Sequence, residues 1–209
     1  MLLFGSLEPP FIIGTLIAVL IGMTFHEFAH NYVAHLMGDP VPAREGRLTL
    51  DPSVHIYWPG FIMFVLIGFG ILGSAPIAAH RMRNPRWGYL AAVAAGPFSN
   101  LLLAIVFAIP YRLIGGFPDT IQIVLFLIVF WNVLLFIFNL LPLFPIDGWH
   151  IVLALLPPDL AVSWQRNAQT TQYIFLGLIL LSFFPFGNFN ILTTLIGEPT
   201  FRIMSLLTG

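Results

Sequence analysis

Long apolar runs separated by short polar linkers dominate the pattern of this chain. Uncharged runs cover residues 9–25, 58–79, 89–111, 120–146 and 170–197. A helix needs about 20 mostly apolar residues to cross the hydrocarbon core of a bilayer. The pattern therefore predicts an all-α polytopic membrane protein, a bundle of about five to six transmembrane helices.

The linker at residues 38–57 has a different pattern from the other linkers. The segment from Arg47 to Asp51, RLTLD, alternates polar and apolar side chains, which is typical of a strand rather than a helix. We expect a short membrane-associated β-strand or hairpin here, after the first helix. The sequence contains no internal repeat, so we expect a single domain over residues 1–209, with a core at about 10–156 and C-terminal helices at about 170–209.

The composition narrows the class of protein further. Hydrophobic residues make up 58% of the chain and charged residues only 8%, against roughly 25% charged in an ordinary soluble domain. This composition excludes a soluble enzyme and a disordered chain. With a net charge of −1, the chain also lacks the excess of basic residues that binds nucleic acid. The chain has no Cys, so thiolate metal sites are excluded. We expect a multi-pass protein of the cell membrane whose environment is the lipid bilayer; the sequence does not indicate an oligomeric state.

Ionisable residues interrupt the first apolar run. His26 and His30 lie at positions i and i+4, so they share one helix face and can bind one zinc ion. Glu27 flanks the same site, where it can take a proton from a water that the metal activates. A chance occurrence of HExxH is the alternative, but three uncompensated ionisable groups within an apolar helix would be costly.

A third metal ligand is expected, since catalytic zinc usually has three protein ligands. Asp147 stands out because it closes the uncharged run 120–146. Pro142 and Pro145 interrupt that helix, and broken backbone of this kind can bring a carboxylate to a metal on another helix. The alternative for Asp147 is a surface N-cap of the stretch 148–156.

Four segments carry a resemblance to a known family. FHEFAH at 25–30 resembles a first catalytic helix, and NLLPLFPIDG at 139–148 resembles a second signature. GRLTLDPSVHI at 46–56 resembles a membrane-associated strand region, and the segment 83–104 resembles a span with a Gly-Pro-x-x-Asn motif. Together they make the sequence similar to the site-2 protease family of intramembrane zinc metalloproteases, in a minimal form without PDZ or CBS domains.

The resemblance implies a specific set of roles. One Zn²⁺ per chain would be held by His26, His30 and Asp147, with Glu27 as general base. Asn139 would bind the substrate or the oxyanion, with an interhelical hydrogen bond as the alternative. The implied activity is hydrolysis of peptide bonds in or near transmembrane segments, so the partner would be a membrane protein with a transmembrane helix.

Other polar residues near these motifs have open roles. His55 ends the predicted strand region, where it either lines the cavity as a hydrogen-bond donor to substrate or is a solvated loop histidine. His150, three residues after Asp147, fits a partner of that carboxylate or a competing ligand. Gly96 and Asn100 allow close helix packing.

Two rival functions also fit the membrane class. A catalytically idle scaffold of the same fold would not need Glu27. A metal or solute transporter would use the two histidines and Asp147 as a transit site, but transporters often carry paired broken segments in two related halves. The sequence has no second copy of either signature.

Overall fold

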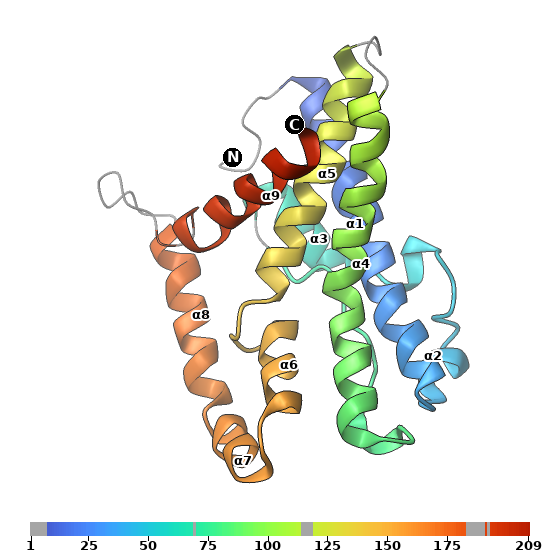
Figure 1. Cartoon of the computed structure of the whole chain (residues 1–209), viewed down its shortest axis with the longest axis vertical. Coiled ribbons are helices and arrows are strands. Elements are labelled where there is room, and N and C mark those ends of the chain that lie inside the picture. Colours follow the sequence, from blue (N-terminus) through green and yellow to red (C-terminus); the bar gives the residue numbers. More distant parts are fainter. Residues whose placement is uncertain (1–7, 69, 114–118, 183–190, 192) are drawn as a thin grey trace.

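The computed structural model describes residues 8–68, 70–113, 119–182, 191 and 193–209. Within these ranges the chain forms α-helices and short helical turns, and no β-strand. Three helices are long and apolar enough to cross a membrane, judged by length and composition: α1 (Pro9–Leu36), α4 (Pro85–Leu113) and α5 (Asp119–Asn139). These three pack against one another as the centre of the molecule (Figure 1).

Small residues of α1, Gly14 and Gly22, lie directly against side chains of α5. The helix α1 begins at paired prolines, where the missing N–H groups cost nothing. Its buried Ala18 and Val19 join a core that includes Leu127 and Trp131 of α5. Because lipid tails are as apolar as these side chains, close van der Waals contact between small residues is what favours helix association in a bilayer.

Shorter helices surround this centre. They are α2 (Val41–Arg44), α3 (Trp58–Ile67), α6 (Asp147–Leu155), α7 (Pro158–Arg166), α8 (Ala168–Ser182) and α9 (Glu198–Thr208). Figure 1 shows α9 crossing α5 near one end of the bundle, with α8 on the far side of α6. Met204 of α9 is buried in a core with Ala104 of α4 and Val133 of α5.

The prediction of about five to six transmembrane helices is wrong for the part of the chain described. The apolar run 58–79 does not form one span, because α3 ends at Gly68, whose left-handed backbone (φ 84°) caps the helix. Residues 70–78 then follow a non-helical path beside α1. In the last apolar run, the described residues of α8 are the 15 from Ala168 to Ser182, and they are not among the candidate membrane spans of the described chain.

The predicted strand or hairpin after the first helix is also wrong. Its described residues contain only an isolated antiparallel bridge between Ile56 and Gly73. The polar linker satisfies its backbone locally instead: Asp51 N–H donates to Thr49 Oγ1 (3.2 Å), and Ser53 N–H donates to Asp51 Oδ1 (2.8 Å). Such side-chain bonds compete with a strand ladder, and here they replace it.

Candidate metal centre

The helix α1 carries three ionisable side chains into the interior of the bundle. His26, Glu27 and His30 are each only 3–4% exposed. The helical spacing places both imidazoles on one face, and their Nε2 atoms lie 3.0 Å apart. The sequence-predicted pair is therefore side by side and buried.

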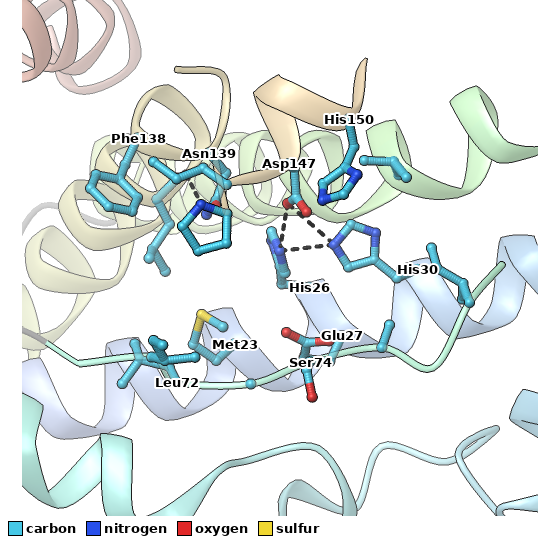
Figure 2. A pocket seen from close by; sticks show the side chains of 18 of the residues that line it. Met23, His26, Glu27, His30, Leu72, Ser74, Phe138, Asn139, Asp147 and His150 are labelled. Carbon is cyan, nitrogen blue, oxygen red and sulfur yellow. Dashed lines mark hydrogen bonds and ion pairs between the residues drawn. The ribbon is translucent and has the colours of Figure 1, made fainter. Parts of the chain in front are cut away.

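Asp147 reaches this pair from another part of the chain. Its Oδ2 lies 3.1 Å from His26 Nε2 and 3.3 Å from His30 Nε2 (Figure 2). The non-helical residues 140–146 separate α5 from α6 and deliver Asp147 as the first residue of α6. The N-cap of α6 is Ile146, so Asp147 does not serve as the surface cap.

The hydrogen bonds of Asn100 fix the tautomer of His26. Asn100 Nδ2 donates to the carbonyl of Gly22 (3.0 Å) and to Asn132 Oδ1 (2.9 Å), so its Oδ1 faces His26. His26 Nδ1–H then donates to Asn100 Oδ1 at 2.7 Å. A neutral imidazole that is protonated on Nδ1 has its lone pair on Nε2, the atom that faces Asp147.

His30 is held in the same way by backbone. Its Nδ1–H donates to the carbonyl of Ala92 at 2.8 Å, which again leaves the Nε2 lone pair toward Asp147. Gly96, one turn further along α4, lies directly against the imidazole, and a Cβ added there would overlap His30 Nε2. The ring of His30 therefore requires a glycine at this point of close helix approach.

These residues fit a zinc ion. When each ring is neutral and carries its proton on Nδ1, both Nε2 lone pairs face a carboxylate oxygen, and among the described residues Asp147 Oδ2 accepts no hydrogen bond. A cation relieves this repulsion. Ligand atoms about 2 Å from a tetrahedral zinc lie about 3.3 Å apart, close to the separations of 3.0, 3.1 and 3.3 Å found here. The donor set of two histidines and one carboxylate leaves a fourth position open, as catalytic zinc sites do.

Glu27 lies beside the three converging atoms but is not one of them. Its Oε2 is buried and, among the described residues, has no hydrogen-bond partner. The other side of its carboxylate packs on Gly73, where an added Cβ would lie 2.6 Å from Glu27 Oε1. The carboxylate is thus confined between α1 and residues 70–78 with one oxygen free to accept a proton.

A cavity of about 350 Å³ opens onto these groups. We call residues 70–78 the wall segment, because its residues 70–75 and 77 line one side of the cavity. In Figure 2, Leu72 and Ser74 of the wall segment lie across from Asp147, with Glu27 and Met23 of α1 between them. A volume of this size holds a few residues of a peptide.

The remaining sequence-predicted residues divide into two groups. Asn139 and His150 line the cavity. Asn139 Nδ2 donates to Leu135 O of its own helix (3.0 Å), and His150 Nδ1 shares a hydrogen bond with the Tyr89 hydroxyl (2.9 Å). His55 does not line it: this histidine is 2% exposed, and its Nε2–H donates to Thr49 O at 2.7 Å. His55 is therefore not a solvated loop histidine.

Several contacts of the centre are not evident from the sequence. Three of them are the carbonyl of Ala92, the amide of Asn132 and the packing of Gly73 on Glu27. No motif in the sequence around these residues predicts a contact with the centre. Asn100 and Gly96 are part of a recognisable motif, but packing was their only expected role. Their direct contacts with the two histidines are the finding that the structure adds.

The fold and this cluster define a class: a helical membrane protein with a site of the metallohydrolase type. Comparisons with known proteins agree. The chain is 32% identical over 181 residues, 83% of its length, to a Bacillus subtilis protein named "Putative zinc metalloprotease YwhC", and covers 81% of that protein. It is 30% identical over 179 residues to "Putative zinc metalloprotease Rip2" of Mycobacterium tuberculosis, covering 66% of it. The Mycolicibacterium smegmatis protein of the same name is 27% identical over 202 residues.

No family model matches the chain, and no solved structure matches it significantly. The curated relatives nevertheless cover most of the chain at an identity that shows common descent. The chain belongs to the site-2 protease family, and the relatives that show this are named as putative zinc metalloproteases.

Proposed function

We propose that this protein is an intramembrane zinc endopeptidase that hydrolyses peptide bonds in or near transmembrane segments of other membrane proteins. It would act as a multi-pass protein of the cell membrane. The observation that carries the proposal is the convergence of His26, His30 and Asp147 beside Glu27, at a cavity among apolar helices. Ionisable groups at such a place are expensive, which favours a catalytic use for them.

The proposed roles follow from the donor atoms. His26 Nε2, His30 Nε2 and Asp147 Oδ2 would hold the zinc ion, which when bound supplies the Lewis acidity that activates water and polarises a carbonyl. Glu27 accepts the proton of the attacking water at Oε2 and returns it to the leaving amine. Removing this proton acceptor is expected to cost about 10²-fold or more in kcat.

Asn139 is proposed to stabilise the oxyanion. An amide nitrogen has two N–H donors, and one of those of Asn139 is used by Leu135 O. The second remains for a developing oxyanion in the cavity that Asn139 lines. The substrate chain must be unwound to reach this point, since a transmembrane helix keeps its amides in internal hydrogen bonds.

The wall segment is proposed to hold the unwound substrate. It is a non-helical stretch of backbone along the cavity, across from Asp147 (Figure 2). An extended peptide placed between the two would find backbone hydrogen-bonding groups on one side and the metal ligands on the other.

Glu27→Gln separates this proposal from its rivals. The purified variant is expected to keep one zinc per chain and to lose cleavage of single-span membrane proteins, because Glu27 is not a ligand. Asp147→Ala is expected to lower the zinc content. Cleavage that persists in Glu27→Gln, or zinc that stays bound after Asp147→Ala, would contradict the proposal. A wild type that binds zinc without cleaving would support a scaffold, and one that moves zinc across vesicles would support a transporter.

A further inference from the structure

In the wall segment, every second backbone carbonyl from residue 72 to residue 76 accepts a hydrogen bond from another part of the chain. The carbonyls of residues 72, 74 and 76 each accept a hydrogen bond from outside the segment. The donors are Tyr57 N–H at 2.8 Å, Arg47 Nη1–H at 2.9 Å and Arg81 Nη2–H, in that order. Only the first donor is backbone; the next two are guanidinium groups.

An alternation of two residues is the period of an extended chain. Carbonyls at 72, 74 and 76 therefore share one edge of the wall segment, and the antiparallel bridge between Ile56 and Gly73 starts that edge. After Tyr57 the chain turns into α3, so no backbone continues alongside. The two arginines occupy the place of a neighbouring strand. On the opposite edge, the carbonyl of Ile71 packs on Gly60 of α3, and the carbonyl of Ala75 accepts from Ile77 N–H at 2.9 Å. The backbone groups of Gly73 are the ones that these contacts leave open on that edge.

Each arginine is itself held by a carboxylate. Arg47 Nε donates to Glu45 Oε2 at 3.0 Å, a pair at the surface. Arg81 donates to both oxygens of Asp39, from Nε to Oδ1 at 2.7 Å and from Nη2 to Oδ2 at 2.8 Å. Such a fork fixes the direction of the guanidinium.

The second of these pairs also ties the wall segment to α1. Asp39 follows the end of α1 and is fully buried. Besides Arg81, its carboxylate accepts from the N–H of Ala78 in the wall segment and from the N–H of Val41, each at 3.1 Å. The helix that carries Glu27 and the segment that packs on it are thus joined at the same end.

We propose that Arg47 and Arg81 are positioning residues for substrate. They hold one edge of the wall segment so that its open edge presents backbone groups to an extended peptide at a fixed distance from the metal ligands. This inference depends on the proposed function, because it concerns how the substrate of that site is bound. Guanidinium suits the role, since it stays protonated at all working pH values and donates in a rigid geometry.

Arg47 offers the cleaner test of the two. Its side chain is 23% exposed and its partner Glu45 is 45% exposed, so removing it leaves no buried charge. Arg47→Ala is compared with Arg44→Ala, an exposed arginine on α2 that loses the same charge three residues away. Arg47→Lys restores a single donor.

The readout is cleavage of a fluorescent synthetic peptide with one transmembrane segment by the full-length protein in detergent, together with zinc content. Arg47→Ala is expected to raise KM about tenfold with kcat within about twofold, as loss of one charge-assisted hydrogen bond implies. In the Glu27→Gln background it is expected to weaken the Kd for the same peptide by a similar factor. Arg47→Lys should recover part of the affinity, and Arg44→Ala should match the wild type.

The outcomes distinguish this inference from the function on which it depends. If the wild type cleaves the peptide while Arg47→Ala keeps the same KM and Kd, the positioning role is wrong and the proposed function stands. The role is also wrong if Arg44→Ala raises KM as much, since charge alone then explains the effect. A wild type that neither cleaves nor binds the peptide overturns the proposed function, and the positioning role with it.

Discussion

Asn100 of α4 and His26 of α1 are joined by a hydrogen bond of 2.7 Å in which the imidazole Nδ1–H is the donor. The direction of this bond is set by the Gly22 carbonyl, which can only accept and so turns the amide nitrogen of Asn100 away from the histidine. The lone pair of His26 Nε2, the proposed ligand atom, therefore points toward Asp147. Partners of this kind orient the ligand and raise its basicity.

Asn100→Ala is expected to lower the zinc affinity about 10- to 100-fold, because His26 loses the acceptor that fixes its tautomer. The affinity is measured by competition with a coloured chelator. Asn132→Ala is the matched control: it also removes a fully buried amide from the same network, but one that contacts Asn100 and not the histidine. Equal zinc affinities in Asn100→Ala and the wild type would contradict this role.

Gly96→Ala is expected to abolish stoichiometric zinc binding, because the added methyl overlaps the His30 imidazole. Gly177→Ala in α8 is the control, since a Cβ there meets nothing within 4 Å. In the control, alanine should stabilise the helix by about 0.5–1 kcal/mol. Metal analysis and thermal unfolding of both variants test this pair. Full zinc occupancy in Gly96→Ala would show that His30 can move aside and still bind.

The sequence predicts those parts of the metal centre that lie on a single helix, where the helical period fixes which residues are neighbours. His26, Glu27 and His30 are neighbours on any α-helix, so their cluster follows from spacing alone. Their partners on α4 are 62 and 74 residues away along the chain. Side-chain packing decides which turn of α4 lies against which turn of α1. The hydrophobic periodicity of either helix does not predict this register.

The fold, too, is predicted by the sequence in some parts and not in others. Hydropathy locates apolar runs, and α1, α4 and α5 coincide with three of them. It does not distinguish a helix from an extended path through an equally apolar interior. The run 58–79 is therefore misassigned as a span, although Gly68 breaks it and the wall segment lies beyond. The strand prediction at 47–51 was wrong because the side chains of Thr49 and Asp51 accept hydrogen bonds from nearby backbone N–H groups. These local bonds take the place of the bonds to a neighbouring strand that the alternating pattern predicted.

The Asp39–Arg81 pair predicts how stability depends on pH. Burial opposes ionisation of Asp39, but hydrogen bonds from Arg81 and from two backbone N–H groups outweigh it and lower the pKa of this carboxyl. A lowered folded-state pKa means that the pair stabilises the fold above the unfolded pKa of about 4 and that this contribution is lost as the pH falls further. The difference in Tm between the wild type and Asp39→Asn should be large at pH 6–7 and should shrink below about pH 4.

Arg81→Ala at neutral pH should cost about 3 kcal/mol or more, because it leaves the buried Asp39 carboxylate uncompensated. A Tm difference that stays constant down to pH 3 would show that Asp39 contributes by packing and not by charge.

Gly73→Ala tests the contact between the wall segment and the proposed general base. The new methyl would lie 2.6 Å from Glu27 Oε1, so the carboxylate must shift away from the place where it accepts a proton. Since Glu27 is not among the three converging ligand atoms, zinc content should stay at the wild-type level. We expect kcat to fall about 10²-fold with little change in KM, measured on the same fluorescent peptide. Gly177→Ala, the same substitution at a glycine that does not line the cavity and where a Cβ meets nothing within 4 Å, should leave both constants unchanged. Loss of zinc in Gly73→Ala would instead mean that the wall segment supports the metal ligands, and a normal kcat would mean that Glu27 tolerates displacement and is not the base.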